Sequence, residues 1–308
     1  SCLDKEHSMK VKIWGCRGSL PTPGPKTVKY GGNTTCYELR SESGELLIID
    51  AGSGIRELGL ALLSELPIRS HIVISHTHWD HIMGYPFFTP LYIPGNSFDI
   101  YGPIHFNYSF EDVMKKQMDY TFFPVRMEEL AAELQFHDIK EGEHQIGPFD
   151  VQVQYMNHPV LCLGFRIQVD GKTFVFTGDT EPYFDTVYGD REPQNEEERE
   201  EKEELDAFVQ SQNQRVIEFL RDADLVIYDG AYTLEEYPPK KGWGHSPMEH
   251  CIETSLKANV KKLIITHHDP TRTDDQLDEL LPPFLADLKS QGSSMELEFA
   301  VEGQTHQL

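Results

Sequence analysis

Short apolar runs that end in polar or glycine-containing loops recur along the whole chain. Runs of four to eight apolar or alternating residues, each followed by a turn signal, are typical of β-strands. Strands are predicted at residues 11–14, 36–39, 46–49, 72–74, 151–156, 225–228, 263–266 and 296–301. Residues 165–176 alternate around the pair Asp170-Gly171, which predicts a β-hairpin. The pattern indicates a chain in which buried strands lead directly into loops.

Apolar residues recur at helical spacing between several of these runs. Helices are predicted at residues 55–66, 110–135, 246–257 and 273–290. Ser246 is expected to cap the third of them, with Pro247 at its first position. No internal repeat of fixed period and no linker divides the chain, so residues 9–308 are predicted to form a single domain.

Composition narrows the class of protein. The 308 residues are 39% apolar and 11% aromatic, which suits a globular chain, and a run of 18 apolar residues that could span a membrane is absent. Five scattered cysteines without a Cys-x-x-Cys pair fit reduced thiols, so a cytoplasmic location is expected. Because residue 1 is not methionine and Met9 precedes the first predicted strand, residues 1–8 are interpreted as a tag or processing remnant.

Charge is strongly negative and unevenly spread. The formal net charge is −24, and ten acidic residues stand against three basic ones between Asp190 and Asp206. Residues 185–214 are interpreted as an acidic, solvated insertion that leads into a helix, with a lid or an interaction tail as the alternative. A polyanion would be repelled by this field, so long nucleic acid is disfavoured as a partner.

A cluster of three histidines and one aspartate follows the apolar run 72–74. It consists of His76, His78, Asp80 and His81. Imidazole and carboxylate groups are ligands of zinc, manganese and iron. If the strand continues through His78, the side chains of His76 and His78 share one face. A turn could then bring Asp80 and His81 to a second ion. The alternative is a solvated, histidine-rich turn.

Three later strands also end at candidate ligands. His158, Asp179 and His267 each follow an apolar strand, where catalytic groups tend to lie on loops held by a rigid sheet. With the cluster at 76–81 they make seven ligands, which suit two metal ions with Asp179 as a bridge. His267 and His268 are adjacent on an extended segment, so at most one of them reaches the site.

These motifs, in this order, resemble those of the metallo-β-lactamase-fold hydrolase superfamily. The resemblance rests on His76-Thr77-His78-Trp79-Asp80-His81, His158, Thr177-Gly178-Asp179-Thr180 and His267, and on Asp50-Ala51-Gly52 at the end of an early strand. It implies an α/β (α+β) fold, an αββα sandwich of two mixed sheets flanked by helices. It also implies two ligand sets, namely His76, His78 and His158 for one ion and Asp80, His81 and His267 for the other, with Asp179 bridging.

A second group of motifs resembles the phosphodiesterase branch, which includes tRNA 3′-end-processing endonucleases and cyclic-phosphate phosphodiesterases. Residues 242–247, which contain His245, resemble the histidine segment of that branch, and residues 14–21 and 31–36 resemble its first loop. Asp229 stands where the branch places an acidic residue that orients this histidine. The long basic arm of the tRNA enzymes has no evident counterpart, which disfavours a tRNA substrate.

The expected protein is therefore a dinuclear metal-dependent hydrolase, a phosphodiesterase acting on a small phosphodiester or cyclic nucleotide. Asp80 is expected to accept a proton from the attacking water, and His245, with its tautomer fixed by Asp229, to protonate the leaving oxygen. Arg17 and Asn33 are expected to contact the substrate. Zinc is the expected metal, with manganese or iron as alternatives.

Three other classes stay open at this stage. The first is a hydrolase of lactones or thioesters on the same fold. The second is a di-iron flavoprotein oxidoreductase, which normally needs a flavodoxin-like domain, and a chain of 308 residues lacks room for one. The third is a metal-binding member without enzymatic activity. The sequence leaves the oligomeric state undetermined, with a homodimer as one option.

Overall fold

The computed structural model describes residues 9–189 and 191–308, so the segment interpreted as a tag or remnant lies outside the described residues. Two seven-stranded sheets make up its centre. The first contains β1 (Lys10–Gly15), β2 (Cys36–Arg40), β3 (Leu46–Ile49), β4 (Arg69–Val73), β5 (Ser97–Pro103), β6 (Glu133–Ile139) and β14 (Thr305–Gln307). The second contains β7 (Gly142–Ile146), β8 (Phe149–Met156), β9 (Cys162–Val169), β10 (Lys172–Phe176), β11 (Leu225–Asp229), β12 (Lys262–Thr266) and β13 (Glu296–Phe299).

Both sheets are mixed. The first runs in the order β14-β1-β2-β3-β4-β5-β6, antiparallel as far as β3 and parallel from β3 to β6. The second runs in the order β13-β12-β11-β10-β9-β8-β7, parallel from β13 to β10 and antiparallel beyond. Strands β3 and β11 are buried along their whole length, which accounts for their uninterrupted apolar sequences.

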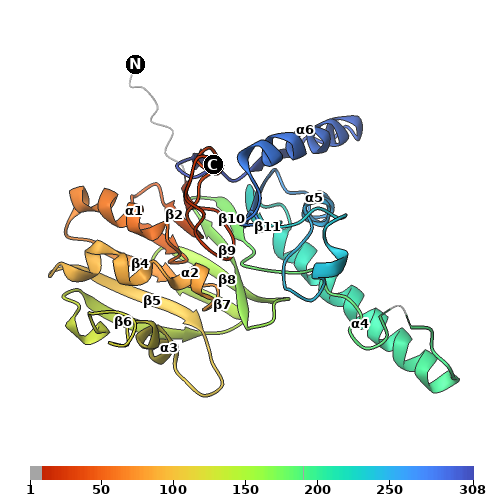
Figure 1. Cartoon of the computed structure of the whole chain (residues 1–308), viewed down its shortest axis with the longest axis horizontal. Helices are drawn as coiled ribbons and strands as arrows, with labels where there is room; N and C mark the ends of the chain where they lie inside the picture. Colours follow the sequence, from red (N-terminus) through yellow and green to blue (C-terminus); the bar gives the residue numbers. More distant parts are fainter. Residues whose placement is uncertain (1–8, 190) are drawn as a thin grey trace.

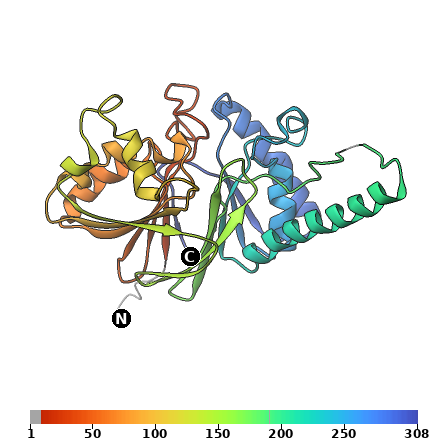
Figure 2. The ribbon, with the colours of Figure 1, turned by 90° about the horizontal axis from the view of Figure 1, so that it is seen from below.

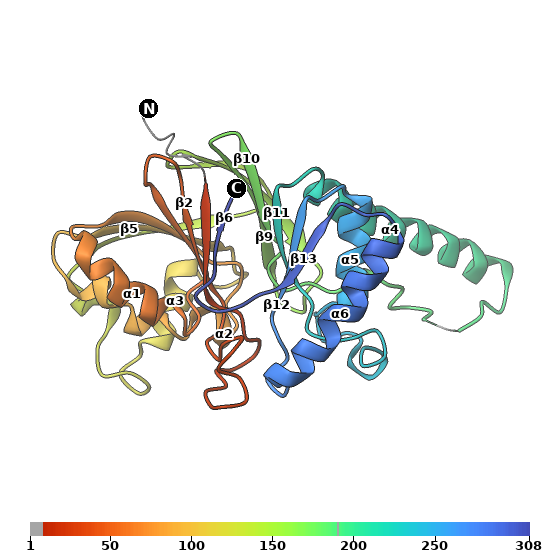
Figure 3. The ribbon, with the colours of Figure 1, turned by 90° about the horizontal axis from the view of Figure 1, so that it is seen from above.

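Helices cover the outer faces of the two sheets. They are α1 (Ile55–Ala61), α2 (Trp79–Ile82), α3 (Phe110–Gln117), α4 (Glu196–Leu220), α5 (Met248–Lys257) and α6 (Asp274–Ser290). Figure 3 shows α1 and α3 outside the first sheet and α4, α5 and α6 outside the second. None of the helices in the described ranges is long and apolar enough to cross a membrane.

The apolar core has three parts, as this layering requires. One cluster joins the inner faces of the two sheets and includes Val11, Ile49, Phe165 and Ile227. A second cluster lies between the second sheet and α4 to α6, and a third between the first sheet and its helices. Helices outside two facing sheets make an αββα sandwich, so the predicted architecture is confirmed.

Several predicted elements need correction. The helix predicted at 110–135 ends at Gln117, and a loop leads from it into strand β6 at Glu133. Pro124 within that loop lacks the backbone N–H that a continuing helix would need. Helix α5 begins at Met248, two residues later than predicted, because the hydroxyl of Ser246 donates a hydrogen bond to the Thr180 carbonyl oxygen (2.7 Å) and does not cap the helix.

The acidic segment forms most of the longest helix. Asn195 caps α4 by accepting a hydrogen bond from the Glu198 N–H at 2.9 Å, and three glutamates stabilise the helix N-terminus through the helix dipole. The C-terminal turns pack on the second sheet through the buried residues Val216, Phe219 and Leu220. The N-terminal half of α4 projects away from the rest of the molecule (Figures 1 and 2).

The topology brings the strand ends of interest to one edge. Strands β10, β11 and β12 are mutually parallel, and β8 runs in the same direction because β9 is antiparallel to both β8 and β10. The carboxyl ends of these strands therefore lie together, where ligands of open α/β sheets bind. The segments after them carry the candidate ligands of the second sheet.

Candidate metal centre

The histidine cluster of the first sheet lies where β4 gives way to α2. Strand β4 ends at Val73, so the strand does not continue through His78. His78 instead precedes α2 in an extended conformation, which places Asp80 and His81 in that short helix. The rings of His76 and His78 still meet, with 3.1 Å between Nε2 of His76 and Nδ1 of His78.

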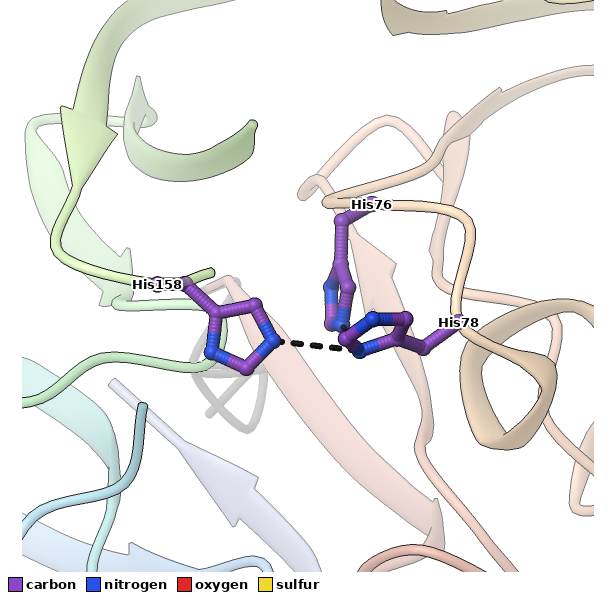
Figure 4. A group of neighbouring side chains, drawn as sticks. All are labelled: His76, His78 and His158. Carbon is purple, nitrogen blue, oxygen red and sulfur yellow. Dashed lines mark hydrogen bonds between the residues drawn. The ribbon is translucent and has the colours of Figure 1, made fainter. Parts of the chain in front are cut away.

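His158 completes a first group of three imidazoles (Figure 4). Its Nε2 lies 3.1 Å from Nδ1 of His78, and one nitrogen from each of the three rings falls within 4.8 Å of the others. The Nδ1–H of His158 donates to the carbonyl oxygen of Gly244 at 2.9 Å, so in the neutral ring Nε2 presents its lone pair to the group.

The electrostatics of this first group favour neutral rings. Burial lowers the pKa of His76 well below its usual value and that of His158 to about 4. A neutral imidazole is the form that binds metal. Three convergent lone pairs repel one another unless a cation lies between them, so the donor set fits a divalent metal ion.

A second group joins carboxylates to histidines. It consists of Asp80, His81, Asp179 and His267, which contribute ligand atoms within 4.8 Å of one another and are all buried. Oδ2 of Asp179 lies 3.1 Å from Nε2 of His81 and 3.2 Å from Nε2 of His267. The same oxygen lies 3.5 Å from Nε2 of His76 in the first group. Asp179 therefore stands between the two groups, the position that a bridging carboxylate requires.

This second group carries paired charges on side chains that are almost fully buried. Although burial opposes ionisation, His267 and His81 hold the pKa of Asp179 well below its usual range. Burial likewise opposes protonation of His81 and His267, but the carboxylate of Asp179 raises the pKa of both rings well above normal. The buried carboxylates thus need positive charge beside them. A divalent cation would supply it.

Asp50 holds a histidine of the second group in place by a hydrogen bond. It follows β3, is fully buried and has a left-handed backbone conformation with φ of 59°, a conformation that clusters at functional sites. Its carboxylate accepts hydrogen bonds from the Ser75 N–H and hydroxyl, both at 2.7 Å, and from Nδ1–H of His81 at 2.6 Å. In the neutral ring this last bond leaves the lone pair on Nε2, which lies 3.1 Å from Oδ2 of Asp179. The Asp-x-Gly motif at residues 50–52 was the sequence signal for this position.

Replacement of Asp50 by alanine is expected to lower metal affinity by about ten- to a hundredfold, because His81 loses the group that fixes its tautomer and orientation. Competition with a chromophoric chelator measures this affinity. Asp274→Ala is a matched control, since Asp274 is also a buried carboxylate that accepts backbone N–H bonds, from Lys29 and Tyr30, and it belongs to neither ligand group. Equal affinities in the two variants would contradict the role of Asp50.

His245 lies beside the second group. Its Nδ1 is 2.8 Å from Oδ2 of Asp229, and its ring stacks on that of His267 with 4.4 Å between centroids. Asp229 ends β11 and is fully buried, so the predicted pairing of Asp229 with His245 is present. His245 also lines a pocket of about 380 Å³ together with Ser19, Thr77, His78, Trp79, Asp80 and Asp179. The pocket gives solvent and substrate access to both groups.

Glu181, absent from the predicted site, shapes the loop that carries His245. Its carboxylate accepts hydrogen bonds from the hydroxyl of Tyr237 (2.6 Å) and from the N–H groups of Gly242 (2.7 Å) and Gly244 (3.0 Å). The carbonyl of this same Gly244 accepts the hydrogen bond from His158. Glu181 therefore supports the position of His158 through Gly244. Its position two residues after Asp179 was the sole sequence signal.

Backbone conformation places His267, and not His268, in the second group. His267 has φ of 59°, which turns its ring into the second group. Nε2–H of His268 points the other way and donates to the Ala300 carbonyl oxygen at 2.8 Å. Gly18 makes room for the first ring, because a Cβ at that position would lie 2.3 Å from Nδ1 of His267.

Arg17 and Asn33 lie outside both groups. The side chain of Arg17 is fully buried and donates to the carbonyl oxygens of Gly31, Asp269 and Arg272, so its prediction as a substrate contact is wrong. These bonds tie the first loop to the segment after β12. The amide of Asn33 pairs with Glu302 and Ser53 and lines a different pocket. Its predicted contact with substrate has no support in this geometry.

Comparisons with known proteins agree with this architecture. Residues 46–194 match the model of a family described as "Beta-lactamase superfamily domain". The matched range contains six of the seven predicted ligands and ends before His267. A ribonuclease Z from Staphylococcus aureus (strain MSSA476) is 24% identical over 301 residues, covering 88% of this chain and 92% of that protein.

Two solved structures extend the match to the whole chain. The metallo-β-lactamase-fold protein YhfI from Bacillus subtilis superposes with a TM-score of 0.65 at 19% identity, covering 98% of this chain and 100% of that one. A diphosphatase from the PhnP family superposes with a TM-score of 0.64 at 16% identity, covering 97% and 98%. The predicted fold and the predicted family resemblance are confirmed.

Proposed function

We propose that the chain is a dinuclear metal-dependent phosphodiesterase that cleaves a small phosphodiester or cyclic nucleotide. The match of residues 46–194 to the β-lactamase superfamily domain and the metallo-β-lactamase fold support this proposal. One observation carries the proposal. The imidazole of His245 is hydrogen-bonded to the buried carboxylate of Asp229. This pair lies beside Asp179, the carboxylate that stands between the two groups of candidate metal ligands. Phosphodiester cleavage uses both parts, charge neutralisation at the phosphoryl group and a proton for the leaving oxygen.

In this proposal the two ligand sets are those that surround Asp179. His76, His78 and His158 hold one ion, Asp80, His81 and His267 hold the other, and Asp179 bridges. Divalent ions, with zinc proposed and manganese or iron as alternatives, would neutralise charge on the phosphoryl oxygens and make water acidic enough to attack near neutral pH.

The side chains around the ions would then move protons. The Asp80 carboxylate, held by the Ser19 N–H at 2.8 Å, is placed to accept a proton from the attacking water. Nδ1–H of His245 donates to Asp229, whose carboxylate can balance the positive charge of the doubly protonated ring. The proton on Nε2 of His245 would then be transferred to the leaving oxygen. Asp229 would keep the ring in the tautomer and orientation that this transfer requires.

A small substrate is proposed because the chain as a whole is strongly acidic. The chain has a net charge of −24, and the acidic helix α4 lines a pocket together with His158. Each further phosphate of a long nucleic acid would meet this repulsion. A cytoplasmic location stays a prediction.

Cleavage of RNA is the second candidate. The relative in Staphylococcus aureus is named ribonuclease Z, and the match runs through 88% of this chain. A single RNA 3′ end could reach the pocket beside His245 if the rest of the molecule stayed clear of α4. The comparison therefore leaves open the prediction that long nucleic acid is disfavoured.

The test combines metal content with a substrate panel. The purified protein should hold close to two zinc, manganese or iron ions per chain by elemental analysis and should hydrolyse bis(p-nitrophenyl) phosphate. The panel comprises cyclic nucleotides, nucleotide phosphodiesters, short RNA, lactones and thioesters. Turnover of lactones or thioesters without phosphodiesters would reject the proposal, and turnover of RNA without small phosphodiesters would replace it by the second candidate.

A further inference from the structure

A second pocket lies on the other side of His158, toward helix α4. It has a volume of about 350 Å³ and is lined mainly by apolar and aromatic side chains. The lining residues are Asn157, His158, Pro159, Glu181, Tyr183, Phe184, Thr186, Leu205, Phe208, Val209 and Gly242. Its size and its apolar lining with few polar groups are those of small-molecule sites.

This pocket adjoins the proposed metal centre through a shared residue. Nε2 of His158 faces His78 in the first imidazole group, while the His158 ring also lines the pocket. The ring centroids of His158 and His245 are 5.3 Å apart. A molecule whose phosphate lies at the metal centre could therefore place a directly attached group in the pocket.

Polar contacts between α4 and residues 183–188 hold the walls of the pocket in place. The side chain of Asn213 on α4 accepts from the N–H of Tyr183 and donates to its carbonyl oxygen, both at 2.9 Å. Farther along, the hydroxyl of Tyr188 donates to Glu201 at 2.7 Å, and Lys202 pairs with Asp185 at 3.5 Å. The segment after Asp179 is thus bound to α4, so the pocket exists before a ligand enters.

The pocket has few charges in its lining. The acidic residue among its lining residues is Glu181, whose carboxylate already accepts hydrogen bonds from Tyr237, Gly242 and Gly244. Nζ of Lys241 lies 4.3 Å from the ring centroid of Phe184, which forms part of the wall. The apolar lining therefore favours an uncharged ring. Phe208 keeps 57% of its surface exposed and offers a face on which a planar group could stack.

We propose that the pocket between α4 and residues 157–159 binds an uncharged aromatic group, such as a phenyl ring or a nucleobase, carried by the phosphate that the metal centre binds. The inference rests on the proposed function. It assigns the acidic insertion a role in substrate selection, because apolar residues of α4 would receive the ring.

The test measures binding of two phosphonates that are not hydrolysed. Phenylphosphonate and methylphosphonate should both bind the metal-loaded protein in calorimetric titrations, with phenylphosphonate about tenfold tighter because its ring leaves water for an apolar pocket. The double variant Leu205→Ala/Phe208→Ala should lose this preference and keep its affinity for methylphosphonate. Glu203→Ala, an exposed residue of α4 that does not line the pocket, is the matched control and should keep the preference.

Three results would overturn the inference. Equal affinity of the two phosphonates for the unaltered protein would show that the pocket receives no ring. A preference that survives in the double variant would place the ring elsewhere. Failure of both phosphonates to bind the metal-loaded protein would reject the phosphate site itself, and the proposed function with it.

Discussion

Replacement of Asp179 by alanine is expected to abolish binding of both metal ions and to reduce phosphodiester hydrolysis by at least about a thousandfold. Oδ2 of Asp179 lies within 3.5 Å of nitrogens from His76, His81 and His267, so a single oxygen serves both groups. Its removal takes negative charge from the centre of a buried cluster of imidazoles. A metal ion is worth several kcal/mol of transition-state stabilisation, and each 1.4 kcal/mol is a factor of ten in rate.

Elemental analysis of the dialysed variant should therefore give close to zero ions per chain, and the rate with bis(p-nitrophenyl) phosphate should approach the uncatalysed rate. Asp150→Ala on β8 is a matched control, since Asp150 is an exposed aspartate of the same sheet and should retain both properties. A variant of Asp179 that kept two ions and normal turnover would rule out the bridging role.

Replacement of His245 by alanine is expected to reduce turnover by about a hundred- to ten-thousandfold while both metal ions stay bound. Positioned proton transfer contributes rate factors of this size. The ring donates to Asp229 and stacks on His267, but it belongs to neither of the two predicted ligand sets. The loss should appear in kcat more than in KM, because the proton is needed as the leaving oxygen departs.

The leaving group distinguishes a proton donor from a merely structural histidine. A p-nitrophenolate ion leaves without protonation more easily than an alkoxide. The loss in His245→Ala should thus be smaller with bis(p-nitrophenyl) phosphate than with a diester that releases an alcohol. His250→Ala is the control, because His250 lies on α5 and bonds to Thr254. Loss of metal in His245→Ala, or an equal loss with both substrates, would argue against proton donation.

Local sequence was sufficient to predict the strand-end residues of the site. Apolar runs mark buried strands, and parallel strands end at one edge, so His158, Asp179 and His267 were expected near the cluster at 76–81. The structure brings all seven side chains together in two adjoining groups, though through a short helix at residues 79–82 in place of a continued strand. Their assignment as metal ligands stays a prediction.

Other features depend on contacts that no local pattern encodes. Arg17 was expected to contact the substrate, yet three backbone carbonyls distant in sequence surround its guanidinium. Strand β5 carries a glycine and a proline, and β7 and β14 are short edge strands, so their patterns were too weak for prediction. Glu181 acts on a loop some sixty residues away, a pairing visible in space and not in sequence.

Each proposed metal ion would draw its ligands from both halves of the molecule. His76 and His78 follow a strand of the first sheet, whereas His158 follows a strand of the second, and the other set is divided in the same way. A bound ion would then act as a reversible cross-link across the seam between the sheets, one that the unfolded chain cannot form. Unfolding would become harder as free metal increases, by about 2.7 kcal/mol at a hundredfold excess over the dissociation constant. Metal supply would thus govern the lifetime of the folded protein as well as its chemistry.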